Sequence, residues 1–179
     1  MLIRTIFSGF GGQGVLSMGY TVANTAMLEG KYVTYLPSYG VEVRGGTANC
    51  TVVVSDEEIA SPVASEPEFV LVMNQPSFLR FQSILQSGGL MCVNSSIVNT
   101  SNARGDIEIV AIPTTELAEK LGTIKVANMI MLGAFIKASN IVSFDFLMKH
   151  MAEILGEGKS KLTKINREAL QMGFDYAKE

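Results

Sequence analysis

The residues best suited to chemistry form a glycine-rich run at positions 9–14, Gly-Phe-Gly-Gly-Gln-Gly. Gly9, Gly11 and Gly14 follow the G-x-G-x-x-G spacing, which lets the backbone approach a pyrophosphate closely. A helix that begins directly after such a run directs unpaired N–H groups and a partial positive charge at the anion. The run therefore predicts phosphate binding, and by itself it predicts no reaction.

The flanking segments have the patterns that this interpretation needs. Residues 2–7 are apolar and predict a strand, and the residues from Val15 onward repeat apolar positions with a helical period. A tight turn between a strand and a helix also favours glycine for backbone reasons alone. A purely structural role for the glycines therefore stays open.

A nicotinamide dinucleotide site would need an acidic residue for the ribose, at the end of the second strand and about twenty residues after the glycines. The second strand predicted here, residues 32–36, is followed by Pro-Ser-Tyr-Gly. The nearest acids are Glu29, within the preceding helix, and Glu42, within a second glycine-rich loop. The sequence thus argues against an NAD or FAD site, although a stand-alone nucleotide-binding protein remains one alternative.

The overall charge and hydropathy restrict the classes of partner. With 14 basic and 17 acidic residues the net charge is −3, which gives no global field for nucleic acid or an anionic membrane. The mean hydropathy of +0.29 is high and predicts a surface that contacts a partner protein. Because the apolar runs are shorter than a membrane span and no signal segment is evident, no membrane insertion and a cytoplasmic location are expected.

Few groups are suited to catalysis or metal binding. Cys50 and Cys92 are the only cysteines, so neither a disulfide framework nor a four-thiolate iron–sulfur cluster is expected within this chain. His150, the only histidine, lies late in a predicted helix, where a structural role is the commoner one. We therefore expect no catalytic residue and no metal ligand here.

The order of elements predicts one domain over residues 1–179. The first half reads β-α-β-loop-β, a βαβ unit follows, and the end of the chain is helical. This order is typical of a three-layer α/β/α sandwich with a Rossmann-like, mixed but mostly parallel sheet of about six strands. Thr114 is expected to cap a short helix, and the helix after it is apolar on nearly all sides and therefore buried. The predicted elements after the first helix are strands at 32–36, 51–54, 69–73, 90–93 and 107–112 and helices at 76–86, 116–121, 126–138 and 143–155, followed by a last amphipathic helix.

The second loop, residues 37–46, reads Pro-Ser-Tyr-Gly-Val-Glu-Val-Arg-Gly-Gly. Together with the run at 9–14, it resembles the paired signature of the gamma subunit of 2-oxoacid:ferredoxin oxidoreductases. Residues 55–62, 128–133 and 166–173 agree with the same family, so the similarity spans essentially the whole chain. It is most similar to the stand-alone gamma chains of the 2-oxoglutarate type, and pyruvate, ketoisovalerate and indolepyruvate relatives share the same loops.

The resemblance implies a heteromeric complex that decarboxylates a 2-oxoacid on thiamine diphosphate and transfers the acyl group to coenzyme A (CoA). Two electrons would pass through [4Fe-4S] clusters to ferredoxin. Thiamine diphosphate would be held by alpha and beta subunits, and the clusters by beta and ferredoxin-like delta subunits. The gamma chain would help form the CoA site and the complex and would be inactive alone; whether the isolated chain forms a homodimer is left open.

The resemblance also implies which residues contact CoA. Arg44 would grip a phosphate bidentately or pair with Glu42 to hold the loop, and Tyr39 would stack on adenine or pack against a neighbouring subunit. Asn128 would cap or brace its helix. A purely structural assembly subunit is the other alternative. The implied CoA-binding residues of the two loops are Gly9, Gly11, Gly12, Gln13, Gly14, Tyr39 and Arg44.

Overall fold

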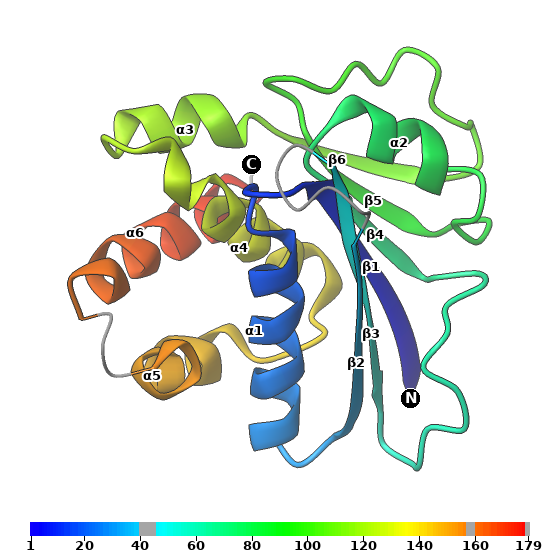
Figure 1. Cartoon of the computed structure of the whole chain (residues 1–179), viewed down its shortest axis with the longest axis horizontal. Helices are drawn as coiled ribbons and strands as arrows, with labels where there is room; N and C mark the ends of the chain where they lie inside the picture. Colours follow the sequence, from blue (N-terminus) through cyan, green and yellow to red (C-terminus); the bar gives the residue numbers. More distant parts are fainter. Residues whose placement is uncertain (40–45, 157–159, 178–179) are drawn as a thin grey trace.

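The computed structural model describes residues 1–39, 46–156 and 160–177; among these, the strands and two helices lie before residue 113, and helices follow (Figure 1). The elements are β1 (Leu2–Phe10), α1 (Val15–Leu28), β2 (Tyr32–Tyr39), β3 (Thr47–Ser55), β4 (Phe69–Val72), α2 (Gln75–Phe81), β5 (Leu90–Asn94), β6 (Glu108–Ile112), α3 (Thr114–Lys120), the 3-10 turn η1 (Ile124–Val126), α4 (Ala127–Ser139), α5 (Phe144–Leu155) and α6 (Ser160–Tyr176).

The strands form one six-stranded sheet in the order β2-β3-β1-β4-β5-β6. β1, β4, β5 and β6 pair in parallel, whereas β3 lies between β1 and β2 and is antiparallel to both. All strands except β3 therefore point the same way, and the predicted mixed, mostly parallel sheet is confirmed. β3 is reversed because β2 returns into it through a short connection, which pairs strands antiparallel.

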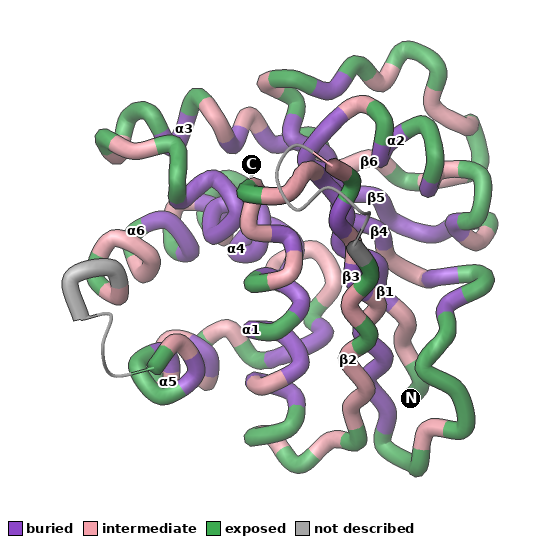
Figure 2. The backbone as a smooth tube through the Cα atoms, in the orientation of Figure 1, coloured by how far each residue is buried: buried purple, intermediate pink, exposed green. Residues whose placement is uncertain are grey.

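Helices cover both faces of this sheet. α1 and α4 pack on one face, with α3, α5 and α6 on the same side, and α2 lies on the other face (Figure 1). Alternate residues of β1 belong to the two cores: Phe7 packs beneath α1 and α4, and Ile6 belongs to the smaller core beneath α2. Buried positions accordingly follow the strands and the inner sides of the helices (Figure 2). The three-layer α/β/α architecture is confirmed.

Three strands run several residues further than the sequence pattern predicts. β3, predicted at 51–54, spans Thr47–Ser55. β1 continues past Phe7 because it remains paired with β3 as far as Phe10 and Thr47. β2 continues through Pro37 to Tyr39, so the predicted loop is shorter than expected. Proline is tolerated there because β2 is an edge strand, where an N–H facing away from the sheet is not needed.

The predicted cap of α3 is wrong. Thr114 is the first residue of the helix, Pro113 occupies the N-cap position, and the buried Thr114 hydroxyl has no hydrogen-bond partner. The start of α2 is conventional by comparison. Asn74 accepts a hydrogen bond from the Ser77 N–H and proline stands in the first turn, as predicted for Pro76.

α2 ends at Phe81 rather than near Gln86. The turns after it are held by Arg104, whose guanidinium donates to the carbonyl oxygens of Gln82 (2.6 Å) and Leu85 (2.7 Å). A side chain from a distant loop thereby satisfies carbonyls at the end of this helix, which local sequence could not indicate.

α4 is buried on nearly all sides, as its composition predicts. Phe135 packs edge-on against Phe7 and Phe69, with ring centroids 5.8 and 5.6 Å apart. Away from the sheet, α4 crosses α6 at Gly133 and Gly173, where each glycine faces the backbone of the other helix. Although α4 is apolar, no helix in the described part of the chain is both long and apolar enough to cross a membrane.

The amino terminus is tied down by one exposed carboxylate. Asp56 accepts hydrogen bonds from Lys31 and from the Met1 ammonium group (2.8 Å). Its hydrogen bonds to Lys31 and to the amino terminus lower the pKa of Asp56 from 3.8 to about 2. A depressed carboxyl pKa stabilises the folded state above the unfolded-state pKa, and this stabilisation disappears as the pH falls through the folded value.

We therefore expect Asp56→Asn to lower the melting temperature slightly at neutral pH, because the ion pairs are exposed. The difference from wild type should shrink between about pH 4 and pH 2, where Asp56 becomes protonated in both states. Melting curves of the two proteins across this range measure it. An undiminished difference at pH 2 would contradict the assignment.

Candidate functional site

The glycine-rich run lies at the carboxyl end of β1, beside the end of β4 (Figure 1). The loop from β1 leads to α1 on one face of the sheet, and the loop from β4 leads to α2 on the other face. These two loops therefore flank the topological switch point of the sheet, where successive helices change faces. Ligands of open α/β sheets bind outside the carboxyl ends of strands at such a point. The fold therefore places residues 9–14 where a ligand site is expected.

Gln13 ties this loop to the end of β4. Its Oε1 accepts from the Phe10 N–H (2.7 Å) and from Asn74 Nδ2 (3.3 Å), while its Nε2 donates to the Met73 carbonyl (2.9 Å). Both ends of the amide are thus used within the protein. The side chain of Gln13 supports the shape of the site, a role that sequence analysis missed because its partners at β4 are 60 residues away.

Two backbone donors of the run are also engaged. The Gln13 N–H donates to the Phe10 carbonyl (3.1 Å), and the Gly11 N–H donates to the Gly46 carbonyl (2.9 Å). The second contact brings the end of the second signature loop against the first. The structure therefore places Gly46, the described end of the second loop, beside the first run.

Gly9 and Gly14 are required by packing. A Cβ atom at Gly9 would lie 2.7 Å from Gln13 Oε1 and 2.9 Å from Val15 Cγ1, closer than side chains tolerate. A Cβ atom at Gly14, where φ is +74°, would overlap the Asn128 amide, which donates to the Gly14 carbonyl (3.4 Å). The structural interpretation of both glycines is supported, and Asn128 braces α4 against the start of α1.

The first turn of α1 can still accept an anion. Gly14 stands at the N-cap position without a side-chain hydrogen bond, and the turn contains no acidic residue. The N–H groups of Val15, Leu16 and Ser17 have no partner within the helix, and the positive end of the helix dipole lies here. Gly12 precedes this turn, with φ of +99° and open space around its α-carbon. This is the part of the run best able to hold a phosphate.

The second loop contributes less to the described site. Glu42 and Arg44 lie outside the described residues, as does the Tyr39 side chain; the Tyr39 backbone ends β2 and pairs with Ala48. Contacts of Tyr39 and Arg44 with CoA therefore remain predictions.

The titratable residues that the structure describes form no catalytic arrangement. Burial raises the pKa of Cys50 to about 12 and raises the pKa of Cys92 further, so both thiols stay protonated at neutral pH. His150 Nδ1 lies 2.9 Å from the Phe146 carbonyl oxygen of its own helix, and the two rings stack. Within the described ranges, no cluster of His, Cys, Asp and Glu side chains could hold a metal ion.

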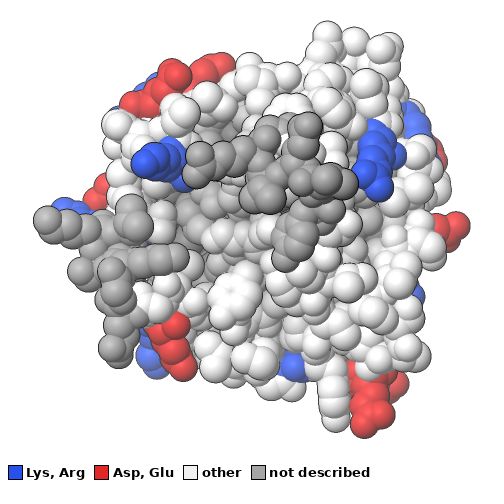
Figure 3. Space-filling view, in the orientation of Figure 1, with Lys and Arg blue, Asp and Glu red and all other residues white. Residues whose placement is uncertain are grey.

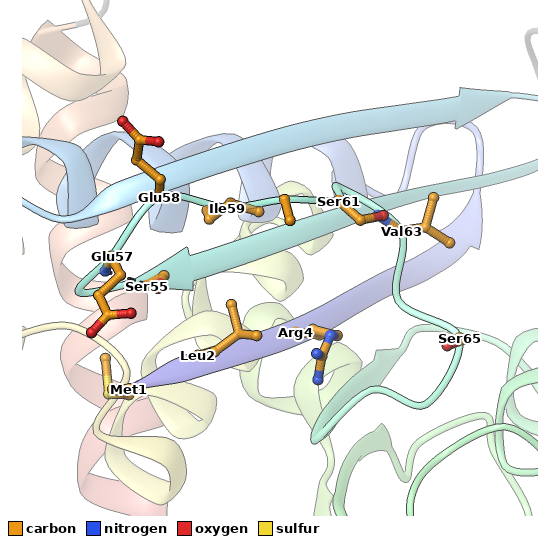
Figure 4. Close-up of a pocket in the computed structure, with 11 residues that line it drawn as sticks. Met1, Leu2, Arg4, Ser55, Glu57, Glu58, Ile59, Ser61, Val63 and Ser65 are labelled. Atoms are coloured by element: carbon orange, nitrogen blue, oxygen red, sulfur yellow. Dashed lines mark hydrogen bonds between the residues drawn. The ribbon is translucent and has the colours of Figure 1, made fainter.

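A separate hollow of about 580 Å³ lies at the opposite end of β1, between that strand, β3 and the segment that follows β3 (Figure 4). The backbone N–H and Nη1 of Arg4 both donate to the Glu68 carboxylate (2.7 and 3.0 Å). Glu57 and Glu58 add two carboxylates to the lining. An already paired arginine and two acids do not suit phosphate, so this hollow is not the predicted CoA site.

Comparison with known proteins tests the resemblance carried by the two loops. The family model for pyruvate ferredoxin/flavodoxin oxidoreductase, POR, matches residues 4–176. The chain belongs to the POR family. A solved gamma subunit of keto/oxoacid ferredoxin oxidoreductase from Geobacter sulfurreducens is 30% identical and has a TM-score of 0.82, with 98% of each chain covered. The resemblance to gamma subunits is confirmed.

Longer POR-family proteins contain a region similar to this chain. Ketoisovalerate oxidoreductase subunit VorA of Methanothermobacter thermautotrophicus is 35% identical over 99% of this chain and 37% of its own length. The 2-oxoglutarate:ferredoxin oxidoreductase of Magnetococcus marinus, solved with 2-oxoglutarate, coenzyme A and succinyl-CoA bound, has the same fold, with a TM-score of 0.90 at 20% identity over 99% of this chain and 31% of that one. The chain thus spans roughly a third of the length of these two relatives.

Proposed function

We propose that this POR-family chain is the gamma subunit of a cytoplasmic 2-oxoacid:ferredoxin oxidoreductase. The complex would decarboxylate 2-oxoglutarate oxidatively, releasing carbon dioxide, transferring the acyl group to CoA and passing two electrons to ferredoxin. Thiamine diphosphate and the [4Fe-4S] clusters would belong to alpha, beta and ferredoxin-like delta subunits, since the described residues here form no metal-binding cluster. The choice of 2-oxoglutarate is supported by the name of a relative of similar length, 2-oxoglutarate synthase subunit KorC of Methanocaldococcus jannaschii, which is 33% identical over 96% of this chain and 92% of its own length, whereas VorA is named for ketoisovalerate.

The contribution of this chain would be to bind and orient CoA. The open first turn of α1 carries this proposal, because its N–H groups lie at the switch point of the sheet without a side-chain cap or an acid in the turn. The end of the second loop contacts the glycine-rich run just before this turn, through the Gly11 N–H and the Gly46 carbonyl. Arg44 in that loop would supply the positive charge for a CoA phosphate.

The structure disfavours the first alternative, a dinucleotide-binding protein, and gives some support to the second, a purely structural assembly subunit. A dinucleotide site is disfavoured because β3 separates β2 from β1, so the end of β2 is not adjacent to the glycine-rich run as it is in dinucleotide-binding folds. A purely structural assembly subunit is favoured by one observation, the packing requirement at Gly9 and Gly14. The experiments below separate it from a CoA-binding role.

Affinity purification of the chain from its native cells, with mass spectrometry of the bound proteins, tests the complex. Thiamine-binding and cluster-bearing subunits should be recovered in a fixed ratio, and the purified complex should reduce ferredoxin with 2-oxoglutarate and CoA. Recovery of the chain alone, from cells that express the candidate partners, would contradict the proposal.

Ser17→Asp in the purified complex tests the CoA site. Ser17 is exposed in the first turn of α1, so an acid there should stabilise the helix slightly through its dipole. The same negative charge should repel a phosphate and raise the KM for CoA by about 5-fold to 10-fold. Steady-state kinetics should show no change in the KM for the oxoacid.

Ser17→Asn is the matched control, because it has the size of aspartate without the charge, and its KM for CoA should stay near wild type. Gly14 is a poor probe because any side chain there would meet Asn128. An unchanged KM for CoA in an intact Ser17→Asp complex would favour the assembly-subunit alternative.

A further inference from the structure

β2 is an edge strand without a charged residue. Its sequence is Tyr-Val-Thr-Tyr-Leu-Pro-Ser-Tyr, and among the described strands only β3 pairs with it. Tyr32 and Leu36 are 50% and 43% exposed on the sheet face away from α1. Soluble proteins usually protect such edges with charges, bulges or covering segments. Within the sequence of β2, Pro37 is the one such device, and it lies toward the end of the strand.

α1 continues this uncharged surface on the other side of the edge. The Tyr20 ring packs edge-on against Tyr35 of β2, with ring centroids 6.1 Å apart. Tyr20 and Met27 are 49% and 56% exposed and share one face of α1, a helix with no charged residue. Among the described residues visible in Figure 3, charged side chains lie mainly toward the rim of the view. Tyr20, Met27, Tyr32 and Leu36 define what we call the β2 edge surface.

We propose that two copies of this chain associate through the β2 edge surface, about a two-fold axis that pairs β2 with β2 of the second copy. This inference rests on the fold and not on the proposed enzymatic function. A free strand edge is satisfied by another strand, and a two-fold axis makes that pairing antiparallel and self-complementary. Because β2 and α1 contain no charged residue, two identical surfaces meet without electrostatic repulsion. A partner selected by opposite charge would have no charged side chain in these two elements to pair with.

The geometry also limits the register of this pairing. Pro37 has no N–H to donate, so continuous pairing is confined to Tyr32–Leu36, centred on Thr34. The exposed faces of the two α1 helices would then meet on one side of the extended sheet, with Tyr32 of each copy near Leu36 of the other on the opposite side. Apolar and aromatic side chains would thus be buried on both sides of the new strand pair.

Sedimentation velocity of the isolated chain across a concentration series tests the association. We expect a reversible dimer, with slower hydrogen exchange of the β2 amides as concentration rises. The Tyr32→Lys/Leu36→Lys variant and the Tyr32→Glu/Leu36→Glu variant should each dimerise at least about 10-fold more weakly, because like charges meet at the axis. Mixing the two variants should restore a dimer that contains one chain of each.

Ile124→Lys provides the control, because Ile124 is equally apolar and 61% exposed but lies in η1, outside the β2 edge surface; its dimerisation should match wild type. Circular dichroism of every variant verifies folding. A wild-type chain that is monomeric at all concentrations would overturn the proposal. A dimer that survives in both double variants, or a mixture that stays monomeric, would show that copies do not meet at this surface.

Discussion

Gly173→Ala is expected to destabilise the fold by about 3 kcal/mol or more, at the upper end of the cost of overpacking. A Cβ atom at Gly173 would collide with the Ile130 carbonyl oxygen of α4, and one at Gly133 would collide with the Leu170 carbonyl oxygen of α6. Backbone cannot rotate away as a side chain can, so the two helices must separate. For a protein of this size the melting temperature should fall by about 6–12 °C.

Gly133→Ala should have a similar effect, and the double variant should cost less than the sum, because the first substitution already forces α4 and α6 apart. Gly105→Ala is the control, since a Cβ atom there meets nothing within 4 Å, and it should change stability by less than about 0.5 kcal/mol. Differential scanning calorimetry measures all four proteins. Fully additive losses, or wild-type stability of Gly173→Ala, would contradict the close helix crossing.

Gln13→Leu is expected to cost about 2 kcal/mol and to loosen the candidate site. Leucine leaves the Phe10 N–H and the Met73 carbonyl without the partners that Gln13 supplies, and a partly buried polar group that loses its partner is costly. Hydrogen exchange should accelerate at the backbone amides of residues 9–14. In the purified complex, the KM for CoA should rise more than the KM for the oxoacid.

Gln75→Leu is the matched control, because Gln75 makes a similar pair of bonds to the Asn99 backbone (3.1 and 2.7 Å) in a solvent-exposed setting. Water can replace these bonds, so the expected cost is below about 1 kcal/mol. Equal losses for the two variants, or unchanged exchange at residues 9–14 in Gln13→Leu, would show that Gln13 does not brace the loop.

The sequence by itself determined the features that depend on neighbouring residues. The glycine-rich run between a strand and a helix, the buried character of α4 and the approximate positions of the strands follow from local periodicity and turn chemistry. The parallel pairing of β4 and β5 follows from the helix that connects them, α2. The paired loops also sufficed to indicate the family, since each is a short continuous motif.

Only the tertiary structure decided what the residues of the site do. Gln13 contacts Met73 across 60 residues, and Asn128 contacts Gly14 across 114. Neither pairing has a local signal, because the distance between such residues is set by how α1, α4 and β4 pack. For the same reason, the structure showed that Gly9 and Gly14 pack closely against other residues and that the first turn of α1 is uncapped, where we propose that a phosphate binds. The tertiary structure also placed β2 at the edge of the sheet, because β3 lies between β2 and β1.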